Sequence, residues 1–408
     1  MDKINILGVN LTKAGRQEVL KKIDGWLTAG GSHQIVTPNP EIILAAIGHD
    51  EELFYILNKA DLAVPDGVAL KFAAWLLGKN IIRITGADLT VEILRLAENN
   101  NKKVMIFNWR GGLSKAAEIK SAIIKKFPGL ELQVEDIERA VSADLAGAKQ
   151  FSPDVIFSTL GAPDQEKFIF HALPNLPTAK IGLGVGGSFD FLTGKLPRAP
   201  LWLRTIGLEW LWRLIKQPKR WRRIYNAVIV FPYKFLLWRF ILPRFYRENV
   251  ACLLYQREND KFKILIVERA DSTGHWQLPQ GGVDGQDIMS AGARELSEEI
   301  NTDKFKPVAA FAKLHQYEFG NLMGKFMVPA KKVRGYRGQK QSLFIAEFLG
   351  ADADIKVNFW EHAAWRWVEA EKLVAEVHPV RRASAKIFMD KFNEFVISTP
   401  HLMRGRNL

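Results

Sequence analysis

The chain has 408 residues, of which 48% are hydrophobic and 25% charged, so it is long and apolar enough for two buried cores. Its net charge is +13, and segment 195–247 accounts for +12, because it holds thirteen Lys and Arg and one acid, Glu209. The single cysteine, Cys252, excludes an intrachain disulfide, and the start of the sequence lacks the pattern of a signal peptide. We expect a cytoplasmic protein in which a cationic segment joins two near-neutral globular parts.

Residues 1–195 alternate short apolar runs with amphipathic stretches, a pattern that predicts a layered, Rossmann-like α/β domain. Apolar residues spaced three and four apart indicate the helices, and short apolar runs indicate the strands. The predicted strands are 34–39, 62–66, 104–108, 155–161 and 181–187, and the predicted helices are 15–27, 40–60, 67–77, 88–99, 114–127 and 163–173.

Three of the predicted strand ends carry polar residues just before a helix, in segments 37–41 (TPNPE), 65–67 (PDG) and 161–166 (GAPDQE). Ligands of open α/β sheets bind at the carboxyl ends of the strands, and the helix amides behind them favour a diphosphate. The three segments therefore predict a site for a nucleotide or a sugar nucleotide. Taken singly, each is also what a helix N-cap or a Pro/Gly turn would use.

Two further motifs are discounted. Segment 182–187 spells GxGxxG, but it ends a strand late in the domain and no clear helix opens on its third glycine, so we do not expect a dinucleotide site. Segment 352–354 spells the DxD of metal-dependent glycosyltransferases, but it lies far along the chain in a predicted hairpin turn. Asp190 is expected to be structural.

Segment 196–247 interleaves Arg and Lys with Trp, Phe and Tyr. Its longest uncharged run, 224–233, has ten residues and contains Pro232, so we expect no membrane-spanning helix, which needs about 20 apolar residues. The composition predicts a peripheral element in the headgroup layer of an anionic membrane. The same residue types would also suit nucleic-acid binding, or a basic linker packed on its own domain.

Six segments of the first 240 residues form a recognisable set by their order and spacing. They are TPNPEII (37–43), VPDGVAL (64–70), RITGADL (83–89), LGAPDQEKF (160–168), GVGGSFDFLTGKLPRAP (184–200) and LEWLWRLIKQPKRWRR (208–223). Taken together and in register, they resemble the WecG/TagA/CpsF glycosyltransferase family over residues 1 to about 240. The resemblance implies an inverting transfer of N-acetylmannosamine, or its uronic acid, from a UDP-sugar to GlcNAc on undecaprenyl diphosphate. It also implies peripheral attachment to the inner face of the cell membrane, and a role in making a cell-surface polysaccharide.

Asp66 is the predicted catalytic base. An acceptor hydroxyl is a poor nucleophile, so a carboxylate must take its proton, and Asp66 sits at a strand end where Gly67 lets the backbone turn closely past a ligand. It also matches the proposed catalytic aspartate of the family.

Because this domain has no DxD, we expect no metal there. Arginines from the basic segment are predicted to stabilise the UDP leaving group, unless they only meet phospholipid. The predicted substrate-binding residues are Thr37, Asn39, Arg83, Gln165, Arg213, Arg220 and Arg223.

A second mixed α/β unit is predicted from residue 248, with strands at 250–255 and 262–268, a Gly-rich turn and a charged helix. On that helix Glu295, Glu298 and Glu299 are three and four apart and share one face. Such carboxylates repel unless a hard divalent cation joins them, and Mg²⁺ prefers oxygen ligands. We therefore predict a Mg²⁺ site, with a solvated acidic helix face as the alternative. Gly281 and Gly282 are expected to let substrate phosphates approach the backbone.

Residues 275–302 resemble the Nudix box, which implies an α/β/α sandwich over about 249–395. The flanks WQLPQGG (276–282), YRGQKQ (336–341) and WRWV (365–368) look like the RNA pyrophosphohydrolase and diadenosine tetraphosphate hydrolase branch. The resemblance implies Mg²⁺-assisted attack of water on a phosphoanhydride, with Glu298 and Glu299 catalytic and Arg294 orienting the carboxylates.

Two residues depart from the box. Gln286 stands where its first Glu is expected, and Asp287 could replace that charge only if the loop shifts. Asn301 stands in place of the final Gly, a mild change because Asn tolerates left-handed geometry.

The predicted organisation is a transferase core (1–195), a basic aromatic appendage (196–247) and a Nudix domain (248–408). The predicted partners are a UDP-sugar, the lipid-linked acceptor, an anionic membrane and a nucleoside polyphosphate. One alternative is a Nudix hydrolase acting on RNA 5′ ends or dinucleoside polyphosphates, with an inactive transferase part and an appendage that binds RNA. Another is a degenerate Nudix module that only binds nucleotide.

Overall fold

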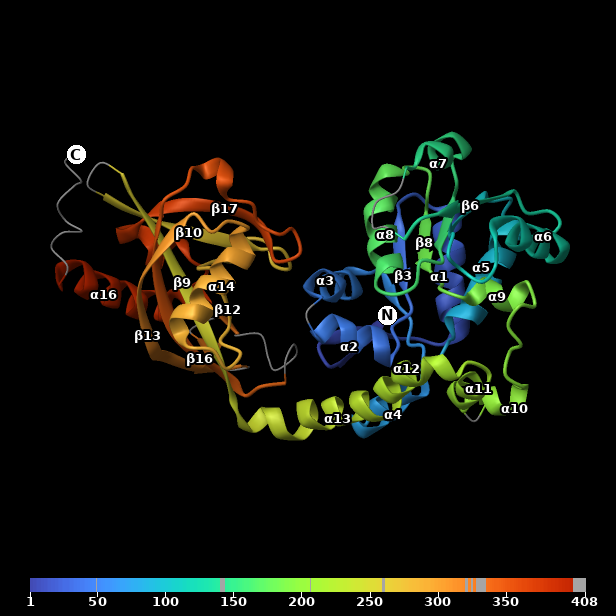
Figure 1. Ribbon diagram of the computed structural model, residues 1–408, viewed down its shortest axis with the longest axis horizontal. Helices are drawn as coiled ribbons and strands as arrows, with labels where there is room; N and C mark the ends of the chain where they lie inside the picture. Colours follow the sequence, from blue (N-terminus) through green and yellow to red (C-terminus); the bar gives the residue numbers. More distant parts are fainter. Residues whose placement is uncertain are drawn as a thin grey trace. The chain divides into compact units, whose positions relative to one another are not determined.

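The structure is a computed structural model that describes residues 1–48, 50–139, 144–205, 207–258, 261–319, 322–323, 326–327 and 335–398. The chain divides into two compact units, Met1–Leu236 and Leu237–Leu408 (Figure 1). The first unit contains the predicted transferase core and most of the basic segment, and the second contains the predicted Nudix domain.

The core of the first unit is a parallel sheet of six strands with helices on both faces, as predicted. Its elements are β1 (Asp2–Ile6), β2 (Val9–Lys13), α1 (Arg16–Thr28), β3 (His33–Val36), α2 (Pro40–Gly48), α3 (Glu51–Lys59), β4 (Leu62–Ala63), α4 (Val68–Leu76), α5 (Gly86–Asn99), β5 (Val104–Trp109), α6 (Ala116–Lys126), β6 (Leu132–Ile137), α7 (Ala146–Phe151), β7 (Val155–Ser158), α8 (Asp164–Ala172), β8 (Ile181–Gly184) and α9 (Ser188–Leu192). The sheet order is β4-β3-β8-β7-β5-β6, and β1 and β2 form a separate antiparallel hairpin.

The two faces of this sheet bury different helices. Apolar side chains of α1, α5 and α6 pack on one face and those of α7 and α8 on the other (Figure 1). The predicted helix 40–60 is two helices, because the Asp50 side chain accepts a hydrogen bond from the Leu53 amide and starts α3. Strand β6 escaped sequence prediction because it lies at the sheet edge, where its four middle residues are only half-buried and show no apolar alternation.

The basic segment is helical. It contains α10 (Leu201–Thr205), α11 (Glu209–Lys216), a 3-10 turn (Pro218–Arg220), α12 (Trp221–Tyr225), a π-helical turn (Asn226–Val230) and α13 (Phe231–Leu236), and in the second unit a π-helical turn (Leu237–Ile241) and a 3-10 turn (Leu242–Arg244). Figure 1 shows α4, α11, α12 and α13 along the same side of the first unit. Phe231 and Phe235 of α13 are buried against α4.

Within the described residues, one helical stretch is long and apolar enough to cross a membrane, the 24-residue Trp221–Arg244. We expected no helix of this length and composition, because the uncharged run is short and contains Pro232, and the helix instead continues through the proline. A proline ring clashes with the carbonyl four residues earlier. Here a π-helical turn precedes the proline, and the Phe231 amide bonds to the carbonyl of Asn226, five residues back. The wider turn accommodates the ring and the helix continues.

The second unit is an α/β/α sandwich, which confirms the predicted Nudix-like fold. Its elements are β9 (Tyr246–Glu258), β10 (Lys261–Arg269), β11 (Trp276–Gln277), β12 (Gln280–Gly282), α14 (Ile288–Ile300), β13 (Phe305–Glu318), β14 (Leu322–Met323), β15 (Phe326–Met327), β16 (Gly338–Phe348), β17 (His362–Glu369), α15 (Leu373–Glu376) and α16 (Arg382–Ser398). The main sheet runs β11-β10-β9-β16-β13, with β12 on β9 and β17 on β10. Apolar residues of α16 pack on one face of this sheet and those of α14 on the other.

The structure corrects details of the two discounted motifs. A five-residue helix, α9, does open directly after Gly187 of the GxGxxG segment. The DxD segment is a 3-10 turn, Asp352–Asp354, rather than a hairpin, because β16 before it pairs with β9 and β13 whereas β17 after it pairs with β10. Its carboxylates have structural partners, since Asp354 accepts from Lys304 Nζ at 2.7 Å and Asp352 from Trp367 Nε1 at 2.9 Å.

Candidate functional site

The ends of β3 and β4 bring two of the predicted site segments together. Backbone hydrogen bonds continue beyond the strands, from the Val64 amide to the Val36 carbonyl and from the Asp66 amide to the Pro38 carbonyl, each at 2.8 Å. The chain then turns at Gly67, which has φ +141°, and a Cβ there would lie 2.9 Å from Pro40 Cδ. Only glycine fits this turn. The bond to the Pro38 carbonyl places Asp66 beside the segment that carries Thr37.

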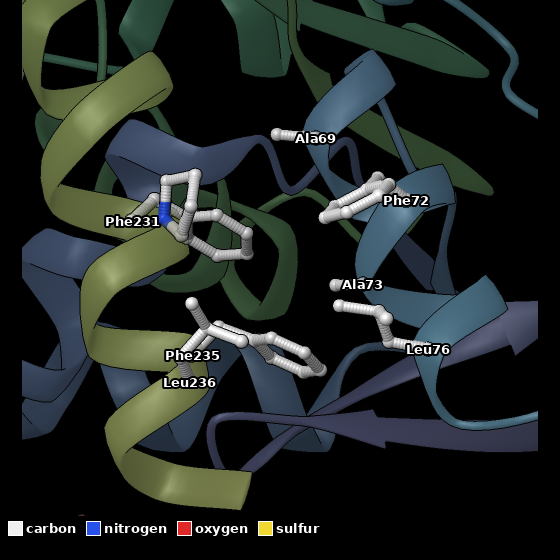
Figure 2. A pocket seen from close by; sticks show the side chains of 8 residues that line it. Ala69, Phe72, Ala73, Leu76, Phe231, Phe235 and Leu236 are labelled. Carbon is white, nitrogen blue, oxygen red and sulfur yellow. The ribbon is translucent and has the colours of Figure 1, made fainter.

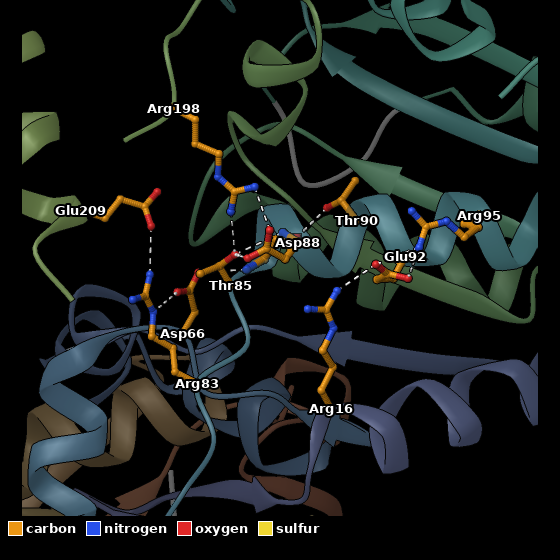
Figure 3. A network of polar contacts seen from close by, with 11 residues as sticks. Arg16, Asp66, Arg83, Thr85, Asp88, Thr90, Glu92, Arg95, Arg198 and Glu209 are labelled. Carbon is orange, nitrogen blue, oxygen red and sulfur yellow. Dashed lines mark hydrogen bonds and ion pairs between the residues drawn. The ribbon is translucent and has the colours of Figure 1, made fainter. Parts of the chain in front are cut away.

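The Asp66 carboxylate is held from two sides (Figure 3). Its Oδ2 accepts a hydrogen bond of 3.0 Å from the amide of Gly86, the first residue of α5, and its Oδ1 lies 3.8 Å from Arg83 Nε. A Cβ on Gly86 would lie 3.3 Å from Thr37 Oγ1 and 3.8 Å from Asp66 Oδ2, so all three residues converge. The Asp66 side chain is 28% exposed, which leaves it oriented and still accessible to a ligand.

Arg83 connects Asp66 to the basic segment. Its Nη2 donates to Glu209 Oε2 at 2.9 Å, and the two side chains are only 18% and 9% exposed (Figure 3). A buried charge needs a partner of opposite sign, so this pair fixes the start of α11 against the Asp66 region. Sequence reasoning missed the role of Glu209, although a lone acid in a strongly basic segment was the signal for it.

A second ion pair missed from the sequence steadies the start of α5. Arg198 Nη1 lies 2.7 Å from Asp88 Oδ1, and its Nη2 donates to Thr85 Oγ1 at 3.2 Å (Figure 3). Thr85 in turn caps the helix by accepting from the Asp88 amide. The Gly86 amide that faces Asp66 is therefore part of a fixed helix terminus.

Asn39, Arg220 and Arg223 have partners within the first unit. Asn39 caps α2, because its Oδ1 accepts from the Ile42 amide at 2.9 Å, and its amide N–H groups remain available to donate to a sugar. Arg223 forms an ion pair with Glu41 at 2.6 Å, which docks α12 beside the same strand end. Arg220 donates to Gln217 at 3.1 Å. The side chain of Arg213, on α11, lies outside the described residues.

Gln165 is buried, and both ends of its amide bind within the protein. Its Oε1 accepts from the Gly186 amide at 2.8 Å, and its Nε2 donates to Glu166 Oε1 at 2.7 Å. A Cβ on Gly184 would lie 2.6 Å from Gln165 Cγ, so this glycine of the GxGxxG segment makes room for Gln165. In the structure Gln165 positions the turn after β8, and these two bonds leave it one further N–H and one further lone pair for a ligand.

Glu166, beside it, is fully buried, and burial raises the pKa of its carboxyl to about 7 although the bond from Gln165 acts in the opposite direction. The pKa of Glu166 in the folded state lies above the ordinary value of 4.5. Its contribution to the free energy of unfolding is therefore fully present below about pH 4.5 and is lost as the pH rises through 7.

We expect Glu166→Gln, which keeps an acceptor for Gln165, to match wild type near pH 4. Above pH 8 it should be more stable by about 3 kcal/mol or less, because an amide needs no buried charge. Thermal unfolding of both proteins at the two pH values tests this. Equal melting temperatures at pH 8.5 would contradict it.

In the second unit, Arg294 organises the predicted catalytic helix, α14. Its Nη1 donates to Glu295 at 2.9 Å and to Glu298 at 3.1 Å, and its Nη2 donates to the Gly282 carbonyl at 2.9 Å. Its Nε donates to Gln286 Oε1 at 2.9 Å. Gln286, at the position of the first Glu of the box, thus accepts this hydrogen bond as a neutral side chain. Asp287 does not take over that contact, because it caps α14 by accepting from the Ser290 amide.

Gly281 faces a side chain of its own fold, and its predicted contact with substrate phosphates stays a prediction. A Cβ on Gly281 would lie 1.5 Å from Glu295 Oε2, so Gly281 makes room for this carboxylate. Burial, followed by the neighbouring Glu299 charge, raises the pKa of Glu295 to about 7 against the opposing effect of Arg294. Asn301 adopts the left-handed φ of +51° that the final Gly of the box would supply.

Glu299 is almost fully buried and has two partners. Its carboxylate accepts from the Gln280 amide at 3.1 and 3.2 Å and lies 3.0 Å from His362 Nε2. His362, also buried, was missed from the sequence, since a lone histidine outside the motifs gave no signal. The Gln280 side chain, with Gln277 and Gln341, lines a crevice on the α16 side of the sheet.

The carboxylates of α14 fit a hard divalent cation by their chemistry. Where the chain is described, no group of three or more His, Cys, Asp or Glu side chains is preassembled around a metal position, and Arg294 holds Glu295 and Glu298 instead. The oxygen donors nevertheless share one helix face. Burial is the main cause of the raised pKa of Glu295 and the Glu299 charge adds to it, and a cation nearby would favour the ionised carboxylate.

Comparison with known proteins matches both units. Residues 4–244 match the model of the glycosyl transferase WecG/TagA/CpsF family, and residues 245–391 match the NUDIX domain. N-acetylglucosaminyldiphosphoundecaprenol N-acetyl-beta-D-mannosaminyltransferase of Bacillus subtilis (strain 168) is 34% identical over 197 residues, covering 47% of this chain and 74% of that protein. RNA pyrophosphohydrolase of Wolbachia pipientis subsp. Culex pipiens (strain wPip) is 34% identical over 155 residues, covering 37% of this chain and 91% of that protein. A solved Ap4A hydrolase of C. elegans aligns with 37% of this chain and 98% of its own, at 21% identity and a TM-score of 0.28.

Proposed function

Because the chain belongs to the WecG/TagA/CpsF glycosyltransferase family and carries a NUDIX domain behind it, we propose a bifunctional enzyme of cell-surface polysaccharide synthesis. The first unit transfers N-acetylmannosamine, or its uronic acid, from a UDP-sugar to GlcNAc on undecaprenyl diphosphate, with inversion. The second hydrolyses a nucleoside diphosphate-linked substrate. The observation that carries the proposal is the Asp66 carboxylate, accessible yet oriented by Gly86 and Arg83 at the carboxyl edge of the sheet.

In the transfer step, Asp66 takes the proton of the acceptor hydroxyl while the hydroxyl oxygen bonds to the anomeric carbon. The bond from that carbon to the UDP oxygen breaks, and the electron pair leaves with UDP. Thr37 and the amide of Asn39 position the sugar. Arg220 and Arg223 stabilise the negative charge that accumulates on UDP, for which Arg223 must exchange Glu41 for phosphate.

We place the protein on the inner face of the cell membrane as a peripheral protein. Helix Trp221–Arg244 has the length to span a bilayer, but it carries Arg222, Arg223, Lys234, Arg239 and Arg244. Lys234 and Arg239 would fall within the hydrocarbon of a spanning helix, where each charge costs about 3 kcal/mol. Lying in the headgroup layer, the same cations meet anionic lipid and the aromatic rings reach the acyl boundary.

Glu209 links this appendage to the base, so we expect Glu209→Gln to slow transfer about tenfold by loosening Arg83 and Asp66. The change keeps the side-chain shape and removes the charge that holds Arg83. Glu92→Gln is the matched control, because Glu92 pairs with Arg16 and Arg95 on the outer side of the same unit. Steady-state transfer rates compare the variants, and equal rates for Glu209→Gln and wild type would remove Glu209 from the mechanism.

For the second unit we propose hydrolysis of a phosphoanhydride, with Glu295, Glu298 and Glu299 as ligands of Mg²⁺. A bound Mg²⁺ would activate water and neutralise the diphosphate. The residues of the chain have three tasks. Arg294 spaces and orients Glu295 and Glu298, the Gln280 amide and His362 hold Glu299, and Gln286 keeps Arg294 in place.

One experiment tests both activities. The full chain is incubated with candidate UDP-sugars and a synthetic lipid-diphosphate GlcNAc acceptor, and separately with Mg²⁺ and a panel of nucleoside polyphosphates and 5′-triphosphate RNA. We expect sugar transfer in the first assay and phosphate release in the second. Absence of transfer with every donor, together with cleavage of RNA ends, would favour the Nudix-only alternative. Nucleotide binding without cleavage would favour the binding module.

A further inference from the structure

Helix α4 carries a stripe of exposed apolar side chains beside the predicted base. Its inner face, Leu70, Ala73 and Ala74, is buried in the core. On its outer face Val68, Phe72 and Trp75 are 39%, 52% and 68% exposed. They are four and three residues apart and so share one side of the helix. The Phe72 and Trp75 rings stack with centroids 5.8 Å apart. A stacked aromatic pair of this exposure marks an interaction surface.

The segment of the chain that carries the stripe contains basic residues and no acid. Between Asp66 and Asp88 the sequence holds three basic residues, Lys71, Lys79 and Arg83, and no acid. The two lysines flank the aromatic pair along the chain. Long lysine side chains can bury their methylene groups beside an apolar surface while the ammonium group stays at a polar or anionic one. The stripe is therefore apolar in the middle and cationic at its edges.

Helix α13 of the basic segment extends the same surface. Phe231 and Phe235 face α4 and, with Phe72, line a narrow apolar crevice between the two helices (Figure 2). Tyr233 and Leu236 of α13 are 62% and 44% exposed. Neither α4 nor α13 contains an acid. The transferase core thus contributes its own helix to a surface that was expected of the basic segment alone.

We propose that α4 is a second membrane-contacting element, which inserts Phe72 and Trp75 into the interfacial layer of an anionic bilayer while Lys71 and Lys79 meet lipid phosphates. The cationic edges call for an anionic partner, and the stripe is continuous with the apolar helix Trp221–Arg244, so we commit to a lipid surface. α4 begins two residues after Asp66, so the depth to which α4 inserts into the bilayer sets the distance of the Asp66 carboxylate from the membrane surface. The inference deepens the proposed function and rests on it only for that last consequence, since membrane contact does not require sugar transfer.

The first test is flotation of the full chain with vesicles containing phosphatidylglycerol or only phosphatidylcholine. Phe72→Ser/Trp75→Ser should lower the partition coefficient on anionic vesicles about tenfold. The control Leu113→Ser/Ile124→Ser removes two apolar side chains that are 50% and 39% exposed elsewhere on the unit, and it should float like wild type. Melting temperatures confirm that both variants fold. Equal flotation of the two folded variants would overturn the proposal.

The second test reads the contact directly and needs no transferase activity. The single cysteine, Cys252, is buried, so Trp75→Cys introduces an accessible thiol for an environment-sensitive dye. We expect a blue shift of the emission with anionic vesicles for Trp75→Cys and none for Ile124→Cys. No shift at position 75 while the protein still floats would restrict membrane contact to the basic segment. A response to single-stranded RNA but not to vesicles would assign the surface to nucleic acid, and either result overturns the proposal.

Discussion

Asp66→Asn is expected to lower the rate of sugar transfer about a thousandfold, within the range attributed to a general base. The substitution is nearly isosteric, and the Asn Oδ1 can still accept the hydrogen bond from the Gly86 amide. What is lost is the ability to take a proton from the acceptor hydroxyl. Donor binding should change little, because Asp66 acts on the acceptor. Transfer of labelled sugar to the lipid-diphosphate acceptor, with titration of the UDP-sugar, separates the two effects.

The control for this prediction is Asp24→Asn. Asp24 lies on α1 and accepts a hydrogen bond from Asn100 at 2.9 Å, so it is a half-buried carboxylate of the same unit that is not at the strand ends. It should transfer at the wild-type rate. If Asp66→Asn transferred within about threefold of wild type, the base would have to be sought elsewhere, since a lost general base costs about a hundredfold or more.

Glu299→Gln is expected to lower Mg²⁺-dependent phosphate release at least about a hundredfold, because it removes a charge from the most buried of the three α14 carboxylates. The neutral side chain keeps the size that fits between the Gln280 amide and His362, so the fold should persist. A readout independent of turnover is the affinity for Mn²⁺ measured by paramagnetic titration, which should fall in parallel. The Glu298 side chain is 59% exposed, so Glu298→Gln should lower the free energy of unfolding less than Glu299→Gln does.

Glu369→Gln is the control for the hydrolase, since Glu369 forms ion pairs with Lys261 and Lys372 on an exposed side of the same unit. It should retain both Mn²⁺ affinity and turnover. Unchanged Mn²⁺ affinity in Glu299→Gln would show that this carboxylate is not a metal ligand. It would then leave Glu295 and Glu298, both held by Arg294, as the remaining candidates on the helix.

The layered fold of the first unit could be predicted because buried parallel strands leave a strong local signal. All five predicted strands occur, and nearly every residue of each is buried. The hairpin of β1 and β2, the edge strand β6 and the break between α2 and α3 carry weaker signals. The persistence of the helix through Pro232 depends on a π-helical turn, which no composition or periodicity reports.

For the sites, the sequence by itself determined the residue types and their order: a strand-end aspartate before glycine, a basic aromatic segment, and three glutamates on one helix face. Only the tertiary structure decided the partners. It brought Glu209 to Arg83 across 126 positions of the chain, engaged both ends of the Gln165 amide, and filled the space at Gly281 with Glu295. Spacing along a helix or strand fixes which side chains share a face. The ion pairs and hydrogen bonds between distant segments form only when packing sets their distances.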